Sequence, residues 1–385
     1  MRILHVIPTM NPLGGGPIEG LRQLAVTTMR LGHAVEVASL DGPDASWLHG
    51  FPFSVHALGP AKFGYRYAAN LAPWLRAHAK DYDALIVEGI WQYHGYAVWK
   101  ALHRTKTPYY VFTHGMLDPW FKHTYPLKHL KKWLYWPWGQ YPVLRDAKAV
   151  LFTCEEERLL ARQSFWLYRA NEVVVGYGTA RPVGDAEAQR ALFFSSYPEL
   201  KGKRIFLFLS RIHEKKGCDL LIKAFAKIAN HYKTLHLVMA GPDQTGWKKD
   251  LMALAQELGV AECITWTGMI SGDLKWGAFH AAETFILPSH QENFGVVVAE
   301  ALACGLPVLI SNKVNIWREV VMDGAGIVAE DTLDGTVELL EKWLAMNATE
   351  QAEMREKTVA CFESRFEMGK AAENLIDVIG GNKNG

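Results

Sequence analysis

Cysteines are few in this chain, and no two of them have the spacing of a redox or zinc motif. Only 5 occur in 385 residues, and all are isolated: Cys154, Cys218, Cys263, Cys304 and Cys361. An odd number of scattered cysteines excludes a disulfide framework and a zinc ribbon, and it is typical of free thiols in a reducing compartment. We therefore expect a cytoplasmic protein.

Excess charge and long apolar segments are also missing. The 41 Lys and Arg residues nearly balance 40 Asp and Glu residues, which argues against the broad basic surface of a nucleic-acid-binding protein. The most apolar long run, residues 296–310, contains Glu300 and is broken at Gly305 and Pro307, so we expect no transmembrane helix. The opening run "RILHVIP" is too short for a signal peptide.

The sequence does contain a repeated alternation of short apolar runs and longer helical patterns. This alternation predicts βαβ units, and hence an α/β fold with two doubly wound parallel sheets. The expected strands lie at residues 2–8, 34–40, 84–89, 109–115, 149–154 and 172–178 in the first half, and at 204–211, 235–241, 263–268, 284–288, 307–311 and 324–330 in the second.

A boundary between two domains is expected near residues 176–184, where Gly, Pro and small residues follow no helical or strand period. The first domain would span residues 1–178 and the second residues 179–364. A cleft between two such domains is the usual place for a ligand. Residues 332–366 predict two more helices.

The loop "NPLGGGPIEG", residues 11–20, follows the first strand and resembles a dinucleotide fingerprint. That fingerprint, G-x-G-x-x-G, needs a third glycine where Glu19 stands, so a nicotinamide dehydrogenase is disfavoured. We interpret the loop instead as a wall of the cleft. The backbone at Gly15 and Gly16 would let substrates approach closely, and Glu19 is a candidate acceptor contact.

The turn "SRIHEKKG", residues 210–217, places Arg211 and Lys216 at the carboxyl end of an expected strand, the edge of an open α/β sheet where ligands bind. Arg offers a fork of donors to phosphate oxygens and Lys a point charge, so the pair suits a diphosphate. The alternative is a solvated charged turn.

Glu292 and Glu300 are eight residues apart where a loop enters an expected helix. On one continuous helix they would lie about 12 Å apart, whereas glycosidases hold their two carboxyl groups roughly 5 to 9.5 Å apart. The two glutamates would therefore contact separate hydroxyl-bearing parts of a long ligand. Asn293, Phe294 and Gly295 at the helix start would offer backbone N–H groups to an anion. Glu300 as a plain surface residue is the alternative.

His114 ends an expected strand in "YYVFTHG" and could donate to a substrate oxygen or stabilise developing charge, although a structural histidine is the alternative.

Asp81 and Asp83 have the spacing of a divalent-ion motif. They precede a strand instead of ending one, so turn chemistry explains them better and we expect no metal site.

Residues 120–145 mix tryptophans with lysines and allow two interpretations. Aromatic bodies beside cations suit peripheral contact with anionic lipid headgroups. The same pattern would also fit a core helix with one solvated face. The residues concerned are Trp120, Trp133, Trp136 and Trp138 with Lys122, Lys128, Lys131 and Lys132.

Together these motifs resemble the retaining glycosyltransferases of family four, of the type that builds bacterial exopolysaccharide and lipopolysaccharide. The resemblance rests on the loop Gly14–Gly16 with Pro17 and Glu19, on His114-Gly115, on "SRIHEKKG", and on an E-x7-E motif followed by "ALACGLPV". It implies the GT-B fold, with two Rossmann-like domains facing each other across a cleft and a final helix, residues 365–381, packed back on the first domain.

The resemblance also implies a role for each matching position. Arg211 and Lys216 would neutralise the leaving nucleotide diphosphate, and Glu300 would hold the ribose hydroxyls. Glu292, with the N–H groups of residues 293–295, would bind the donor sugar. His114 would contact the transferred sugar near the reacting carbon. The backbone at Met269 and Ile270 would read the base.

The implied reaction moves a hexose, in our expectation glucose from UDP-glucose, to a hydroxyl of a carbohydrate or lipid-linked saccharide. The anomeric configuration would be kept, and no metal or other cofactor would be needed. Such an enzyme would serve polysaccharide or glycolipid synthesis, in the cytoplasm or at the inner face of the membrane. The stretch "EGIWQYHGY", residues 88–96, departs from the family pattern.

Two other functions fit the same architecture. A nucleotide-sugar epimerase or a phosphorylase shares the GT-B fold, although a phosphorylase needs a dedicated lysine for pyridoxal phosphate that we do not identify. A non-catalytic module that only binds sugar nucleotides belongs to a different class. The two glutamates, the basic pair and His114 together favour an enzyme.

Overall fold

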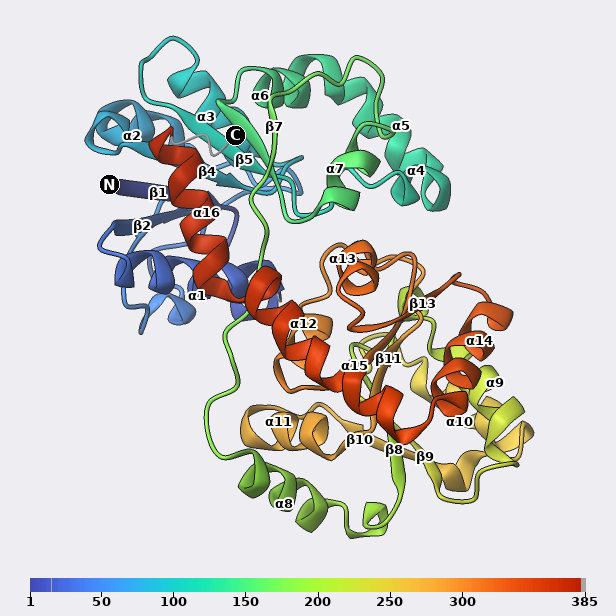
Figure 1. Ribbon diagram of the computed structural model, residues 1–385. Helices are drawn as coiled ribbons and strands as arrows, with labels where there is room; N and C mark the ends of the chain where they lie inside the picture. The colour runs from blue at the N-terminus through green and yellow to red at the C-terminus, as the bar shows by residue number, and fades with distance from the viewer. Residues whose placement is uncertain (15, 382–385) are drawn as a thin grey trace. The chain divides into compact units, whose positions relative to one another are not determined.

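The computed structural model describes residues 1–14 and 16–381, which form two compact units. The first unit comprises Met1–Gly178 and the chain from Met368 onward, and the second comprises Thr179–Glu367. Each unit holds one wholly parallel sheet covered by helices (Figure 1). The chain is therefore α/β, with two Rossmann-like units.

The first sheet has seven strands in the order β3-β2-β1-β4-β5-β6-β7. Strand β3 was not expected from the sequence, because this short edge strand pairs only with β2 and carries Ser54 and His56 in place of an apolar run. The strands are β1 (Arg2–Ile7), β2 (Ala34–Ser39), β3 (Ser54–Ala57), β4 (Ala84–Glu88), β5 (Tyr109–Phe112), β6 (Ala149–Phe152) and β7 (Glu172–Val174).

Helix α16 returns the chain to the first unit, where it lies beside α1 (Figure 1). It buries Met368, Ala372 and Leu375 in a core shared with Ile86 and Phe112 of the sheet. It begins three residues later than expected, because Phe362–Phe366 form a separate π-helical turn. The helices of this unit are α1 (Gly16–Arg30), α2 (Leu71–His78), α3 (Tyr93–Leu102), α4 (Trp120–Thr124), α5 (Pro126–Tyr135), α6 (Tyr141–Arg145), α7 (Glu155–Ala161) and α16 (Met368–Gly380).

The second sheet has the order β10-β9-β8-β11-β12-β13. Its strands are β8 (Arg204–Leu209), β9 (Leu235–Ala240), β10 (Ile264–Gly268), β11 (Thr284–Leu287), β12 (Val308–Ser311) and β13 (Gly326–Ala329). Its helices are α8 (Ala186–Ser196), α9 (Cys218–Ala229), α10 (Lys248–Glu257), α11 (Gly272–Ala281), α12 (Val296–Ala303), α13 (Trp317–Met322), α14 (Leu333–Ala345) and α15 (Ala348–Cys361).

In each sheet the first strands of the unit are added toward one edge and the later strands toward the other edge. The topological switch points between these two directions lie beside β1 and β4 in the first sheet, and beside β8 and β11 in the second. Ligands of open α/β sheets bind outside the carboxyl ends of the strands at such points. Functional side chains are therefore expected at these two places.

Candidate active site

A pocket of about 230 Å³ lies at the switch point of the first sheet. The ends of β1 and β4 both contribute to its wall, as the topology predicts. His114, which the sequence singled out, is one of the residues that line it. Its other polar or loop residues include Thr9, Pro17, Arg66, Glu88 and Gln92.

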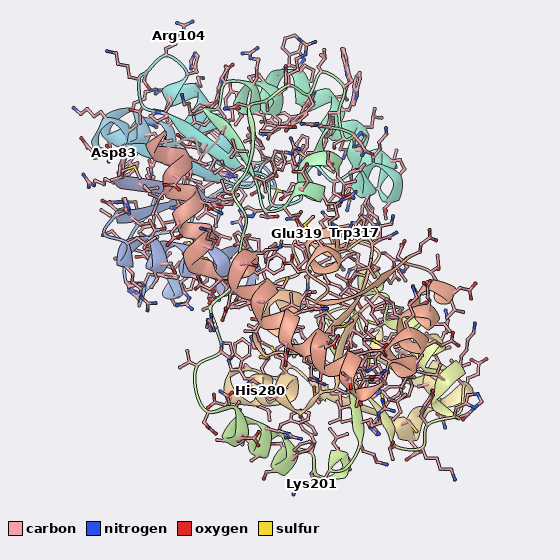
Figure 2. The ribbon with its side chains drawn as sticks, viewed as in Figure 1. Asp83, Arg104, Lys201, His280, Trp317 and Glu319 are labelled. Atoms are coloured by element: carbon pink, nitrogen blue, oxygen red, sulfur yellow. The ribbon has the colours of Figure 1, made fainter. Side chains whose placement is uncertain are left out.

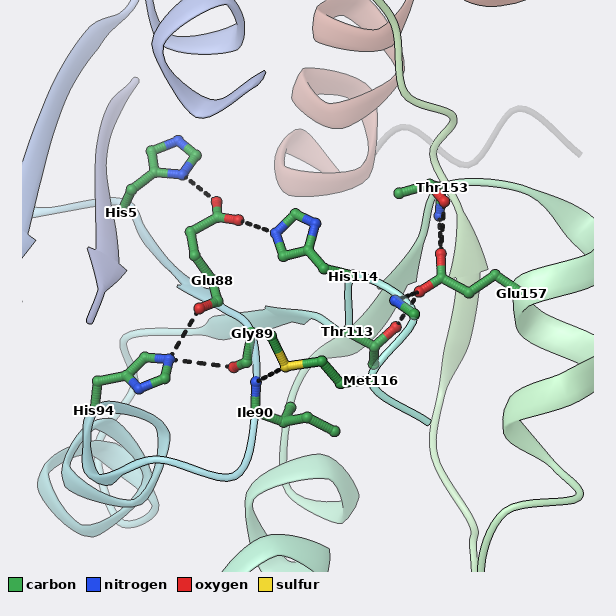
Figure 3. Close-up of polar contacts among 11 residues, drawn as sticks. His5, Glu88, Gly89, Ile90, His94, Thr113, His114, Met116, Thr153 and Glu157 are labelled. Carbon is green, nitrogen blue, oxygen red and sulfur yellow. Dashed lines mark hydrogen bonds and ion pairs between the residues drawn. The ribbon is translucent and has the colours of Figure 1, made fainter. Parts of the chain in front are cut away.

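Glu88 lies between two histidines beside this pocket (Figure 3). His114 Nε2 donates to Glu88 Oε2 at 2.6 Å, and His5 Nδ1 donates to Oε1 at 2.7 Å. Burial works to raise the pKa of Glu88, but these two hydrogen bonds outweigh it and bring the pKa to about 2. Burial works to lower the pKa of His114, and the bond to Glu88 raises it above 6.5. The pair therefore favours a carboxylate beside an imidazolium.

Glu157, on α7, holds the loop that carries His114. Its Oε1 accepts from Thr113 Oγ1 and from the Gly115 backbone N, both at 2.6 Å, and its Oε2 accepts from the N and Oγ1 of Thr153 (Figure 3). One buried carboxylate thus ties the end of β5 to the end of β6. The clamp supports His114 in a left-handed conformation with φ 47°, which is uncommon for a residue with a side chain.

His94 fixes the other wall of the pocket, the turn from β4 into α3. Its Nε2 donates to the carbonyl oxygens of Glu88 at 3.0 Å and Gly89 at 3.2 Å (Figure 3). Burial lowers the pKa of His94 to about 4, so the ring is neutral at physiological pH. Sequence reasoning missed Glu88, His5 and Glu157. The signal for Glu88 was an acidic residue at the end of the otherwise apolar strand "ALIVE".

The glycine loop contributes to this pocket through Pro17 and Ile18 in the first turn of α1. Gly15 lies outside the described residues, and Gly16 begins the helix. Glu19 turns to its own helix, where its carboxylate accepts from Arg22 and Gln23. A contact from Glu19 to an acceptor stays a prediction.

The basic turn lies at the switch point of the second sheet, as expected. His290, after β11, donates its backbone N to Lys215 O at 2.8 Å, which fastens the turn to the neighbouring strand end. Gly217 has φ 64°, and a Cβ there would lie 2.2 Å from Pro288 O, so only glycine permits this approach. Lys216 is buried and Arg211 is exposed. The turn is thus a built structure and not a loose charged loop.

Glu292 forms an ion pair with Lys216. Its backbone is fixed by a bond from its own N to Lys313 O at 2.9 Å and by one from Asn315 N at 3.0 Å. Glu292 precedes α12 and Glu300 lies on it, so a loop enters a helix between them as expected, and the distance of about 12 Å for one continuous helix does not apply. The chain instead turns into the helix at Gly295, with φ 73°.

The residues at the start of α12 and Glu300, the second glutamate of the E-x7-E motif, contact different neighbours. Asn293 lies 3.5 Å from Asn315 through their side chains, while the Phe294 ring is buried against Phe366. Glu300 is held by Lys275, on α11, at 2.8 Å, and its side chain is only 13% exposed. Glu300 is therefore a fixed carboxylate. Lys275 was not foreseen, because it is remote in sequence.

The loop after β10 presents the two residues assigned to the base. Met269 is 75% exposed, whereas Ile270 is buried. Their roles as base-reading backbone stay predictions.

Asp83 accepts the backbone N of Arg2 at 2.6 Å, which is a structural role. Within residues 1–14 and 16–381, no group of three or more His, Cys, Asp or Glu residues has the arrangement of a metal site.

Residues 120–145 form α4, α5, a π-helical turn (Trp136–Gln140) and α6. Trp136 is fully buried, but none of the residues of α5 is. Leu127, Leu130 and Leu134 of α5 are exposed at 77%, 55% and 65%. No helix in the described part of the chain is both long and apolar enough to cross a bilayer.

Both units match family models. Residues 15–178 match the glycosyl transferase 4-like domain, and residues 189–360 match the glycosyl transferases group 1. D-inositol 3-phosphate glycosyltransferase of Mycobacterium marinum is 28% identical over 249 residues, 62% of this chain and 51% of the relative. Its counterpart in Mycolicibacterium gilvum is 34% identical over 181 residues, 44% of this chain and 38% of the relative. The chain thus spans about half or less of these relatives.

Solved structures share the fold over nearly the whole chain. HepE of Anabaena in complex with UDP has a TM-score of 0.79 at 17% identity and covers 99% of this chain and 100% of its own. Sucrose-phosphate synthase of Thermosynechococcus elongatus has a TM-score of 0.75 at 18% identity and covers 99% of both chains. At these identities the likeness is one of fold.

Proposed function

Because the chain is a glycosyltransferase of the GT-B fold, built from a glycosyl transferase 4-like domain and a group 1 domain, we propose that it transfers a hexose from a UDP-sugar to an acceptor hydroxyl with retention of configuration. Glucose is the proposed sugar. The observation that carries the proposal is the second switch point, where Lys216, Glu292 and the start of α12 are held together. HepE of Anabaena, which shares the fold, has been captured with UDP-glucose.

The second unit would stabilise the leaving group. As the bond from the anomeric carbon to the diphosphate oxygen breaks, negative charge gathers on the diphosphate and positive charge on the sugar. Lys216 and Arg211 would neutralise the diphosphate, helped by the N–H groups of residues 293–295. Glu292 would hold sugar hydroxyls, and Glu300 the ribose. Met269 and Ile270 would contact the base.

The first unit would supply His114. Its Nε2 is committed to Glu88, and its Nδ1 has no hydrogen-bond partner among the described residues, so Nδ1 is the atom available to the transferred sugar. The acceptor oxygen would bond to the anomeric carbon as its proton passes to the departing phosphate oxygen. Such a reaction needs no covalent nucleophile and, with two cationic side chains on the diphosphate, no metal.

The test is a panel of labelled nucleotide sugars incubated with the full chain and EDTA. UDP-hexoses should be hydrolysed slowly, with UDP-glucose preferred. Failure of every nucleotide sugar to bind would overturn the proposal, and complete dependence on added metal would overturn its metal-free part. An epimerase would release an epimerised donor, and a non-catalytic module would bind the donor without turnover.

We further propose that the acceptor is a carbohydrate or lipid-linked saccharide used in glycolipid or polysaccharide synthesis, and that α5 attaches the enzyme to the cytoplasmic face of a membrane. Leu127, Leu130 and Leu134 face outward, while Lys132 points inward over the Trp91 ring at 4.7 Å. Burial, with Lys128 nearby, lowers the pKa of Lys132 to about 8. The leucines of α5 face solvent while Lys132 packs against the unit, so the apolar face of this helix is not buried by the unit itself. We propose that an anionic bilayer buries it.

A further inference from the structure

Backbone strain gathers around the pocket of the first unit. Of the non-glycine residues with left-handed φ in the described chain, Arg66 (59°) and His114 (47°) line the pocket, and Trp91 (74°) lies between two lining residues. Phe63 (60°) belongs to the same turn as Arg66. Such conformations cost free energy and collect at ligand-binding sites, where the surrounding structure enforces them. Of the five such residues in the described chain, four therefore lie in or next to the segments that line this pocket, and the fifth, Leu167, lies elsewhere.

The turn that carries Arg66 is fastened at both ends. Lys62 and Tyr67 exchange backbone hydrogen bonds of 2.8 and 2.9 Å, which close the turn. Tyr93, on α3, donates its backbone N to Tyr65 O at 2.9 Å, and its ring lies 4.7 Å from that of Tyr67. Arg66 thus projects from a rigid support, which reduces the entropy lost when it binds a ligand.

The charge of Arg66 is uncompensated. Its guanidinium makes no hydrogen bond or ion pair with any residue that the structure describes. Glu88 is the one acidic side chain among the described residues lining the pocket, and His5 and His114 already occupy its two oxygens. A guanidinium presents paired donors that match a phosphate or a carboxylate. The described lining of this pocket therefore suits an anionic ligand.

We infer that this pocket binds an acceptor carrying a phosphate or carboxylate group, which Arg66 recognises. The inference rests on the proposed transferase function and names the class of its acceptor. The volume of about 230 Å³ is below the roughly 300 to 1,000 Å³ typical of drug-sized ligands, so the pocket fits one substituted sugar-sized ring. Gln92 also lines the pocket, and its side-chain amide would hydrogen-bond to hydroxyls of that ring.

The test is calorimetric binding of glucose, glucose 6-phosphate and glucuronate to the full chain, with saturating UDP to fill the donor site. We expect at least one anionic sugar to bind about tenfold or more tightly than glucose, as a charge-assisted hydrogen bond predicts. Arg66→Gln should abolish that preference and leave glucose binding unchanged. Arg104→Gln is the matched control, because Arg104 projects from the unit after α3 (Figure 2).

Equal affinities of the parent for all three sugars would overturn the inference, as would an Arg66→Gln variant that keeps the preference. Comparison of glucose 6-phosphate with glucuronate shows whether the pocket prefers a phosphate or a carboxylate. Arg66→Gly, which accepts the positive φ without strain, should lose the same preference at an unchanged or higher melting temperature. UDP binding keeps the two proposals distinguishable: its absence defeats the transferase function, whereas normal UDP binding without an anion preference defeats only the role of Arg66.

Discussion

Glu88 is a buried carboxylate whose two oxygens are each bound by one imidazole. A buried charge is tolerated only when it is paired and hydrogen-bonded, and here both conditions are met. Glu88 therefore sets the orientation of His114 and favours its protonated form. It acts through His114 and is a positioning residue.

Replacement of Glu88 by glutamine should move the pH dependence of turnover. The bond to Glu88 raises the pKa of His114, so its loss lowers that pKa, and activity that needs the imidazolium falls off at a lower pH than in the parent. We expect kcat to drop about tenfold at neutral pH, equivalent to about 1.4 kcal/mol. The pH–rate profile of donor hydrolysis measures both effects.

Glu36→Gln is the matched control for this experiment. Glu36 also accepts from a histidine, His56, at 2.7 Å, but it lies on β2 and does not line the pocket. Its replacement should weaken folding and leave the pH–rate profile in place. An unshifted profile in Glu88→Gln would contradict the positioning role.

Lys216 and Glu300 should affect different parts of the donor. Lys216→Met should weaken UDP binding about tenfold to a hundredfold and leave uridine binding unchanged, since uridine has no phosphate. Glu300→Gln should weaken both ligands, because it removes the proposed ribose contact. Lys223→Met, at a partly exposed ion pair on α9, is the control. Calorimetry with both ligands measures this pattern, and equal losses in the Lys216 variant would refute it.

At the scale of elements, Glu157 joins the end of β5 to α7 and the end of β6. Glu157→Gln would turn an amide N–H toward groups that are themselves donors, and it should cost about 1.5–3 kcal/mol of unfolding free energy together with much of the turnover. Glu155→Gln on the same helix should cost under about 0.5 kcal/mol, since its pair with Arg158 is partly exposed. Urea unfolding compares the two, and equal costs would argue against a clamp.

Helix α5 is the element proposed to contact lipid. Leu130→Glu should reduce sedimentation with phosphatidylglycerol vesicles about tenfold, because burial of a leucine contributes roughly 1.5–3 kcal/mol. Leu192→Glu, at an exposed leucine of α8, should bind as the parent does. Binding that is insensitive to Leu130, or absent in the parent, would disprove the contact.

The central strands were predictable because parallel strands covered on both faces are continuous apolar runs, as in "ALIVE" and "RIFLFL". Strand β3 was missed because it lies at the edge of the sheet and is not buried, so it does not need a continuous apolar run. The basic turn and Glu292 were predictable because the carboxyl ends of neighbouring parallel strands meet at one edge of a sheet. Glu88 with His5 was not, because these residues are 83 apart and only the pairing of β1 with β4 brings them together.

At the scale of the whole molecule, both units have a parallel sheet with one topological switch point, and the two switch points carry different functional side chains. The switch point of the first unit holds a carboxylate between two histidines and a strained arginine. That of the second holds a basic turn, a paired glutamate and a helix start. We propose that the two sets of residues act in the same reaction, the transfer of a hexose from UDP.

The most direct test of that claim is the steady-state hydrolysis of UDP-glucose, in EDTA, by the parent and by one variant of each unit. His114→Asn should lower kcat about a hundredfold with little change in KM, because it acts on the reacting sugar. Lys216→Met should raise KM as well as lower kcat. Full activity in the His114 variant, or no turnover of UDP-glucose by the parent, would show that the two units do not share this reaction.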